Sequence, residues 1–160
     1  VAVNDAGARP GTITVADQTF TVNQEAAACS YAVVPTSVSP GASGGSDTFA
    51  VTAESWCGWP ATSNDLPWLT VTSGSPGTGN GSVGYTVAVN DGVARTGTIT
   101  IADQTFTVDQ AAAACHYTLV PASAGVDWPG GAGTFDVTAE SWCDWTATSN
   151  DSASHILLAI

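Results

Sequence analysis

The sequence has very few basic residues. Its 160 residues include 14 acidic side chains, two arginines (Arg9 and Arg95) and no lysine, which gives a formal net charge of −12. Proteins that bind phosphate backbones or anionic membrane surfaces use clustered lysine and arginine to do so. The composition therefore argues against nucleic acid as a partner and against attraction to such a membrane. We expect the acidic side chains to keep a threonine-rich surface soluble.

Long apolar runs and methionine are also missing. The longest apolar run, Ile156–Ile160, is far shorter than the roughly 20 residues that a membrane-spanning helix needs. We therefore predict no membrane insertion. Because neither a methionine nor a leader peptide opens the sequence, we expect a mature or excerpted part of a longer secreted protein, located outside the cell.

The sequence does contain an internal repeat with a period of 86 residues. Residues 1–65 align with residues 87–151 without a gap, and the run Ala53–Cys57 recurs unchanged as Ala139–Cys143. A repeat at a fixed period indicates that one structural unit has been duplicated. The predicted parts are the C-terminal strands of a preceding repeat (residues 1–25), a complete β-sandwich (residues 29–110) and the N-terminal part of a following repeat (residues 115–160).

The alternation of side chains in the complete repeat is typical of β-strands. Val83, Tyr85, Val87 and Val89 alternate with small or polar residues, and no stretch has a helical period. Seven short strands in fewer than ninety residues predict an all-β fold, an immunoglobulin-like antiparallel β-sandwich in tandem repeats. The expected strands are Cys29–Pro35, Thr48–Ala53, Cys57–Ser63, Trp68–Thr72, Val83–Asn90, Thr96–Ile101 and Thr105–Val108.

Short connections separate the last two strands and the successive repeats. Ala102 and Asp103, like their copies at 16 and 17, are expected to form a tight hairpin turn with the aspartate in a left-handed conformation. Glu25–Ala28 and Ala111–Ala114 contain too few alanines to nucleate a helix. We expect them to be short, stiff connectors that join the repeats end to end.

The third part of the sequence stops matching the repeat after Asp151. None of residues 152–160 agrees with its counterpart, so the fourth to seventh strands of this repeat are expected to be missing or altered. Half a sandwich has open strand edges and an uncovered core. Two explanations stay open: the protein continues, or a neighbouring molecule supplies strands of the kind found in residues 1–24.

The four cysteines occur as two pairs with the same spacing of 28 residues. An even number of cysteines at a repeated spacing in a secreted-type sequence predicts one disulfide per repeat, Cys29–Cys57 and Cys115–Cys143. A metal site needs three or four soft ligands close together, whereas the sequence has no CxxC motif and only two histidines. We therefore expect neither a metal site nor another cofactor. Asn-Asp pairs in loops offer oxygen ligands for calcium, but they are also common turn residues.

The second cysteine of each pair lies in a Trp-Cys-x-Trp motif. A period of two places Trp59 on the side of Cys57, so we expect it in the core beside the disulfide. Trp56 should then point outward next to Glu54, where it could stack on a sugar ring, cover the next domain or lie under a loop. The candidate carbohydrate-binding residues are therefore Trp56 and Glu54, with their copies Trp142 and Glu140.

Several motifs of the complete repeat, taken together, resemble the BACON family. They are Cys29-x-Tyr31, Cys57-x-Trp59, Pro67–Val71, Arg95–Ile101 and Gln104–Gln110. The resemblance covers Cys29–Gln110 and most of residues 1–24 and 115–151, whereas residues 152–160 depart from the pattern. It implies an immunoglobulin-like bacterial or phage module of a kind often found beside glycoside hydrolases. The family name implies carbohydrate binding, although many members look like spacers, and the family supplies no catalytic residues to carry over.

Three classes of function can be compared on these residues. Hydrolysis needs a nucleophile with a base, or two carboxylates across a cleft. His116 corresponds to Ser30 in the other copy and His155 lies in the divergent tail, so we predict no enzyme and no catalytic residue. We favour a structural stalk, adhesin shaft or filament subunit, whose partners are neighbouring copies of itself, with strand complementation between chains as one route of assembly. The alternative is a carbohydrate-binding module that uses the surface tryptophans.

Overall fold

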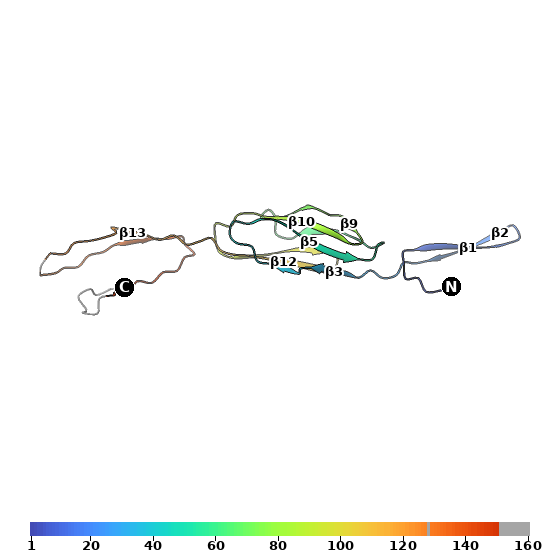
Figure 1. Ribbon diagram of the computed structural model, residues 1–160, viewed down its shortest axis with the longest axis horizontal. Coiled ribbons are helices and arrows are strands. Elements are labelled where there is room, and N and C mark those ends of the chain that lie inside the picture. Colours follow the sequence, from blue (N-terminus) through green and yellow to red (C-terminus); the bar gives the residue numbers. More distant parts are fainter. Residues whose placement is uncertain (128, 151–160) are drawn as a thin grey trace. The chain divides into compact units, whose positions relative to one another are not determined.

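The computed structural model describes residues 1–127 and 129–150 of the chain. The chain divides into two compact units, Val1–Ala113 and a second unit that begins at Ala114. The first unit contains the complete repeat, here called the central module (residues 29–110), and an N-terminal hairpin (Figure 1). No residue in these ranges lies in a helix, so none of them forms a helical membrane span.

The central module consists of two four-stranded sheets. One has the strand order β3-β5-β10-β8 and the other the order β4-β12-β11-β7. Neighbouring strands pair antiparallel, except that β4 pairs in parallel with β12. This arrangement confirms the all-β antiparallel sandwich. The first sheet contains β3 (Tyr31–Val34), β5 (Gly45–Ala53), β10 (Gly81–Val87) and β8 (Leu69–Ser73); the second contains β4 (Ser37–Val38), β12 (Gln104–Gln110), β11 (Arg95–Ile101) and β7 (Ala61–Ser63).

The expected strand Cys57–Ser63 is divided in the structure. Its first part is β6 (Gly58–Trp59), which pairs with β9 (Gly77–Thr78), and its last part is β7 in the second sheet. Pro60 lies between the two parts and has no N–H to donate to a ladder. The chain therefore changes pairing partner at Pro60, and the prediction of one continuous strand is wrong.

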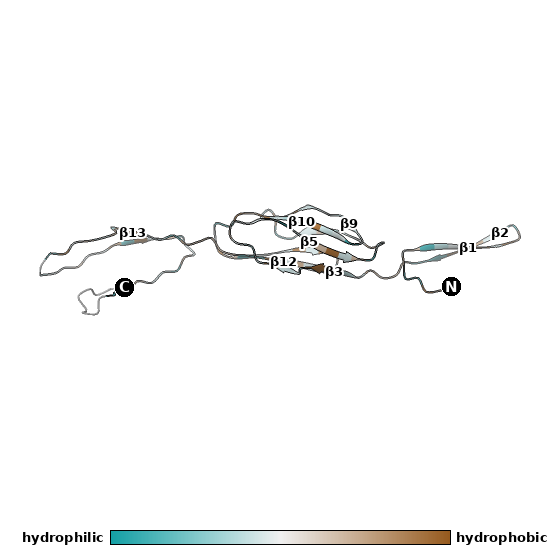
Figure 2. Cartoon of the chain, in the orientation of Figure 1, coloured by the Kyte–Doolittle hydropathy of each residue, from teal (hydrophilic) through white to brown (hydrophobic). Residues whose placement is uncertain are grey.

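Alternate side chains of both sheets form the core of the central module. In Figure 2 hydrophobic stretches lie on β3, β5 and β10. The rings of Phe49 and Phe106, from opposite sheets, have centroids 4.3 Å apart, and Tyr85 lies 5.1 Å from Phe106. All three are almost fully buried. Full burial of one such side chain stabilises a fold by about 1.5–3 kcal/mol, so this aromatic cluster is a main contact between the sheets.

The core also contains Trp59, which the alternation placed there. Trp59 is 2% exposed, and its indole Nε1 donates a hydrogen bond of 2.8 Å to the carbonyl oxygen of Gly79. Gly77 faces this ring, and a Cβ atom built on Gly77 would lie 2.3 Å from it. The ring therefore fits only because the facing strand presents a glycine.

We expect Gly77→Ala to destabilise the module by about 1–3 kcal/mol, because the added methyl group overpacks the Trp59 site. Gly41→Ala is the matched control, since a Cβ atom there meets no heavy atom within 4 Å. The melting temperatures of the two variants, measured by circular dichroism, check this expectation. Equal melting temperatures would contradict the close approach of Gly77 to the indole.

The N-terminal hairpin repeats the register of the last two strands of the module. It is formed by β1 (Arg9–Val15) and β2 (Gln18–Gln24), and Ile13 pairs with Phe20 just as Ile99 pairs with Phe106. In both turns it is the alanine that has a positive φ, 57° at Ala16 and 51° at Ala102. The expectation of a left-handed aspartate is therefore wrong. A turn of the II′ type needs a positive φ at its first central residue only.

The second unit repeats the beginning of the module. Strands β13 (Thr118–Val120) and β14 (Asp136–Thr138) pair antiparallel, as β3 and β5 do. The hydroxyl of Tyr117 donates to the carbonyl oxygen of Asp144 at 2.8 Å, as Tyr31 does to Gly58 at 3.0 Å. The expectation of missing strands beyond Asp151 concerns residues that lie outside the described ranges.

Candidate functional site

The loop between β5 and β6 carries the candidate sugar-binding pair of the central module. β5 ends at Ala53, and a turn closed by a 2.9 Å hydrogen bond from the Cys57 N–H to the Glu54 carbonyl oxygen follows it. The disulfide Cys29–Cys57, with Cα atoms 5.7 Å apart, anchors this turn to the start of the module. A turn does not follow the period of two on which the expected orientation of Trp56 rested.

The carboxylate of Glu54 accepts a hydrogen bond from within the protein. Its Oε2 accepts a 3.0 Å hydrogen bond from the backbone N–H of Ser30, next to the disulfide. This hydrogen bond to Ser30 is the main reason why the pKa of Glu54 lies below its ordinary value, because it stabilises the ionised carboxylate. One oxygen of the expected sugar-binding carboxylate thus holds the first residues of the module in place.

Trp56 is half-buried and lies against the preceding repeat. A Cβ atom built on Gly7, in the segment before β1, would lie 3.3 Å from the Cβ of Trp56. The indole Nε1 is buried and has no hydrogen-bond partner among the described residues. The contact of Trp56 with Gly7 is with the preceding repeat and not with the next domain, which was one of the three roles expected for Trp56. A contact with sugar stays a prediction.

The second unit shows the same arrangement around its own disulfide, Cys115–Cys143. Glu140 Oε2 accepts a 3.1 Å hydrogen bond from the His116 N–H, which is the first cause of the lowered pKa of Glu140. Glu140 Oε1 also lies 3.5 Å from His116 Nδ1. Trp142 is half-buried, and its Nε1 is again without a partner in the described part of the chain. A shallow depression of about 270 Å³ beside these residues is lined by His116, Thr118, Thr138, Ala139 and Glu140.

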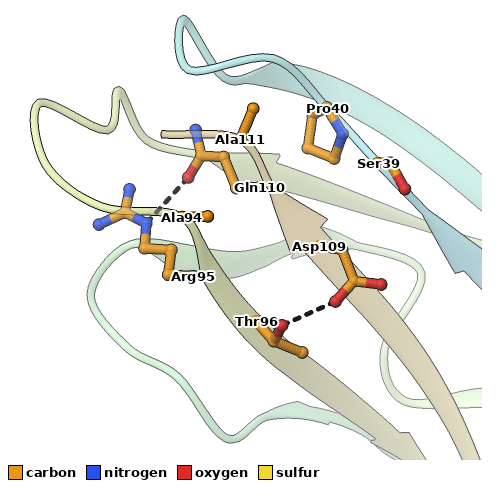
Figure 3. Close-up of a pocket in the computed structure, with 8 residues that line it drawn as sticks. All are labelled: Ser39, Pro40, Ala94, Arg95, Thr96, Asp109, Gln110 and Ala111. Atoms are coloured by element: carbon orange, nitrogen blue, oxygen red, sulfur yellow. Dashed lines mark hydrogen bonds between the residues drawn. The ribbon is translucent and has the colours of Figure 1, made fainter. Parts of the chain in front are cut away.

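A second depression, of about 260 Å³, lies where the module ends (Figure 3). Its polar groups are paired with one another: Arg95 Nε donates to Gln110 Oε1 at 2.9 Å, and the Thr96 hydroxyl donates to Asp109 Oδ1 at 2.7 Å. The Arg95 guanidinium also lies 4.3 Å from the centre of the Trp68 ring. The lining residues are Ser39, Pro40, Ala94, Arg95, Thr96, Asp109, Gln110 and Ala111.

The Arg95–Gln110 pair is a structural feature that the sequence analysis did not identify. Gln110 is 1% exposed, and its Nε2 donates to backbone carbonyl oxygens that include that of Ala88 at 2.9 Å. The first copy has the same pair, with Arg9 Nε donating to Gln24 Oε1 at 3.1 Å. The signal was present in the sequence, because both arginines of the chain occupy the same place in the repeat.

Asn90 is the second such feature, and it holds the connector to the next repeat. Its Nδ2 donates to the carbonyl oxygens of Val93 and Ala111 at 2.7 and 2.8 Å, and its Oδ1 accepts from the Gly92 N–H at 3.2 Å. The Ala113 N–H then donates to the Gly92 carbonyl oxygen at 2.8 Å. With an exposure of only 5%, Asn90 fixes the connector against a loop of the module.

The first copy has the same tether around Asn4. Its Nδ2 donates to the carbonyl oxygens of Gly7 and Glu25 at 2.9 and 2.6 Å, and the Ala27 N–H donates to the Ala6 carbonyl oxygen at 2.9 Å. Two of the Asn-Asp pairs considered for calcium, at Asn4 and Asn90, thus lie in turns that hold connectors, whereas Asn64 and Asp65 bond β11 of the module. Among the described residues, no group of three or more His, Cys, Asp or Glu side chains is placed to hold a metal ion.

Comparisons with known proteins add a family and several distant structural matches. No match was found among curated protein sequences. The "Bacteroides ovatus GH5 xyloglucanase in complex with a XXXG heptasaccharide" is 22% identical, with a TM-score of 0.46 over 52% of this chain and 19% of that one. The "S-layer protein SbsC domains 4 and 5" are 22% identical, with a TM-score of 0.40 over 66% of each chain. The chain thus spans about a fifth of the xyloglucanase.

The sequence match to a family model is more specific than these structural likenesses. Residues 58–111, from the start of β6 to one residue past β12, match the model of the BACON family, whose description reads "Putative binding domain, N-terminal". The matched segment contains the Trp59 site, the Arg95–Gln110 pair and the Asn90 tether. This match confirms the resemblance of the central module to the BACON family over residues 58–111.

Proposed function

We propose that the chain is a non-catalytic, extracellular array of sandwich modules that acts as a structural stalk, adhesin shaft or filament subunit. The observation that carries this proposal is the tether made by Asn90 and repeated by Asn4, which fixes each connector to the module before it. A stalk or shaft stays extended only if its connectors restrict the motion of one module relative to the next. Its partners are neighbouring copies of the same repeat.

The polar side chains that recur in the repeat are hydrogen-bonded within the module, which supports a scaffold without catalysis. Glu54 holds the Ser30 N–H, and Asp65 Oδ2 accepts a 2.8 Å hydrogen bond from the Thr98 N–H. Arg95 is held by Gln110 and by two backbone carbonyl oxygens, those of Ala88 and Val89. Each group thus stabilises the module. A hydrolase would instead present two carboxylates to an open cleft.

The disulfides support an extracellular location. All four cysteines of the sequence are joined in disulfides, Cys29–Cys57 and Cys115–Cys143. Disulfides persist in oxidising surroundings and are rare in the reducing cytosol. A module of about 80 residues buries a limited core, and a disulfide compensates for that in secreted domains.

Asn90→Ala tests the proposed role of the tether. We expect the alanine connector (residues 111–114) to become cleavable by elastase at least several times faster, because the variant loses the hydrogen bond from Asn90 to the Ala111 carbonyl oxygen and those from Asn90 that order the facing loop. Small-angle scattering should show a wider range of conformations for this variant than for the native chain. Asp91→Ala is the control, since Asp91 is the exposed neighbour in the same loop. Equal cleavage rates in both variants would count against a tethered connector.

Carbohydrate binding is the alternative function, and the half-exposed indole of Trp56 beside Glu54 favours it. Tryptophan rings stack on sugars, and the Nε1 of Trp56 has no hydrogen-bond partner among the described residues. If this function holds, Trp56→Ala should abolish retardation of the chain in affinity gels that contain plant or microbial glycans. Ser55→Ala is the control. A native chain that no glycan retards would remove this alternative.

A further inference from the structure

Each disulfide joins an exposed cysteine to a buried one. Cys29 and Cys115 are exposed, whereas Cys57 and Cys143 are only 1% and 8% exposed. An external thiolate opens a disulfide by attacking one sulfur and expelling the other, and access decides which sulfur is attacked. In both pairs the exposed cysteine is therefore the one that is attacked, and the buried cysteine is the leaving group.

A carboxylate lies beside the buried sulfur in both copies. Glu54 Oε2 is 3.6 Å from Cys57 Sγ, and Glu140 Oε2 is also 3.6 Å from Cys143 Sγ. In each copy the cysteine N–H donates to the carbonyl oxygen of the glutamate, at 2.9 and 3.0 Å. This backbone hydrogen bond closes a turn, which keeps the carboxylate and the sulfur together.

Both carboxylates are held in their ionised form. The Ser30 N–H donates to Glu54 Oε2 at 3.0 Å, and this hydrogen bond is the first cause of the lowered pKa of Glu54. The His116 N–H does the same for Glu140 Oε2 at 3.1 Å. The oxygen that contacts the buried sulfur is thus part of a negatively charged group at neutral pH, whether serine or histidine follows the exposed cysteine.

We propose that Cys29 and Cys115 are the sulfurs at which an external thiol enters each disulfide. The carboxylates of Glu54 and Glu140 slow this reaction, because they destabilise the thiolate that must leave. In the first copy the incoming thiolate forms a new S–S bond with Cys29 while the bond between Cys29 and Cys57 breaks. The electron pair of that bond stays on the Cys57 sulfur, which then takes a proton from water.

The leaving thiolate is disfavoured for two reasons. It forms at a buried position, where a charge loses its hydration, and it forms 3.6 Å from a group of the same charge. A less stable thiolate leaves more slowly in thiol–disulfide exchange. The two glutamates therefore keep the disulfides closed kinetically, in addition to any stability that the closed loops give to the fold.

The site of entry is tested on the full chain with an excess of 2-mercaptoethanol. A brief reaction is stopped with acid and the chain is digested with pepsin, because exchange between sulfurs is slow when thiols are protonated. Mass spectrometry should find the mercaptoethanol adduct on Cys29 and Cys115. Adducts in equal amounts on Cys57 and Cys143 would overturn the proposed direction of attack.

Glu54→Gln tests the role of the carboxylate, because it removes the charge and keeps an oxygen that can accept from the Ser30 N–H. Reduction by dithiothreitol at neutral pH, well below the melting temperature, is followed for both disulfides by mass spectrometry. We expect Cys29–Cys57 to be reduced roughly three to ten times faster than in the native chain. The rate for Cys115–Cys143 should not change, which makes it an internal control for reagent strength.

Two further variants complete the comparison. Glu140→Gln should accelerate only the reduction of Cys115–Cys143. Glu25→Gln is the matched control, since it removes the charge of the remaining glutamate of the chain, which lies in the connector before Cys29. Both disulfides should keep their native reduction rates in this variant. If Glu25→Gln accelerated reduction as much as Glu54→Gln, net charge and not the contact with the sulfur would set the rate, and the proposal would fail.

Hydrogen exchange at Ser30 separates the effect of charge from that of a loosened turn. Faster reduction of Glu54→Gln with the Ser30 N–H still protected supports the proposal. Equal reduction rates in Glu54→Gln and the native chain would overturn it, and so would faster reduction that accompanies lost protection of Ser30. These outcomes are independent of the connector tether, which Asn90→Ala tests separately.

Discussion

Phe106→Ala is expected to lower the stability of the central module by about 3–5 kcal/mol, the range for removing a fully buried phenylalanine. The ring is 0% exposed and contacts both Phe49 and Tyr85, so its removal leaves a cavity between the two sheets. Small domains have only about 5–15 kcal/mol in total, so a large share of the stability of the module would be lost. Urea unfolding followed by tryptophan fluorescence measures the change.

Phe20→Ala is the matched control for this experiment. Phe20 occupies the same position in the same hairpin register, but it is 65% exposed. The central module of this variant should therefore unfold at the same urea concentration as in the native chain. If both substitutions lowered the free energy of unfolding by the same amount, the burial of Phe106 between the sheets would be contradicted.

Side-chain alternation predicted the core of the module well. Val83, Tyr85 and Val87 are buried as the alternation predicted, because in a strand a period of two decides which side chain faces the core. Val89 is 63% exposed, since β10 ends at Val87 and the alternation does not continue past it. The sandwich class followed from the number and length of the strands. The division of the third strand at Pro60 could have been anticipated from the missing N–H of proline, but the new partner β9 depends on a loop that brings Gly77 to Trp59.

The candidate site was harder to predict, because its contacts join residues far apart in the sequence. Asn90 reaches Ala111 across 21 residues, and Glu54 reaches Ser30 across 24. No local sequence pattern predicts contacts between residues that are so far apart in the sequence. Trp56 lies in a turn where alternation does not apply, so its half-buried position against Gly7 could not be derived from its neighbours.

The repeat itself carried more information than any single motif. Both arginines pair with a glutamine 15 residues later, and both Asn4 and Asn90 donate to a connector carbonyl oxygen 21 residues later. A polar residue that recurs at the same place in two copies, and in the same hydrogen bonds, indicates a role in the architecture of the unit. In this chain those roles are concentrated at the ends of the module, where one repeat passes into the next.

The disulfide Cys29–Cys57 carries the second large expected effect. Replacing both cysteines by alanine should destabilise the central module by about 3.5 kcal/mol, because the unfolded chain regains the freedom of a loop closed across 28 residues. For a domain of this size that loss corresponds to a melting temperature lower by roughly 15–25 °C. Cys57 is 1% exposed, so the alanine also removes buried sulfur from below the turn that holds Glu54 and Trp56.

The same double replacement in the second unit, at Cys115 and Cys143, separates the contributions of the two disulfides to stability. The central module does not include this bond, so its melting transition in calorimetry should stay where it is in the native chain. Loss of the Cys29–Cys57 bond should also free the Ser30 N–H, because the carboxylate of Glu54 is held opposite it by the disulfide. Hydrogen exchange at Ser30 should therefore rise well before the module unfolds. If the transition of the module moved equally in both double variants, the two bonds would not belong to independently stabilised repeats.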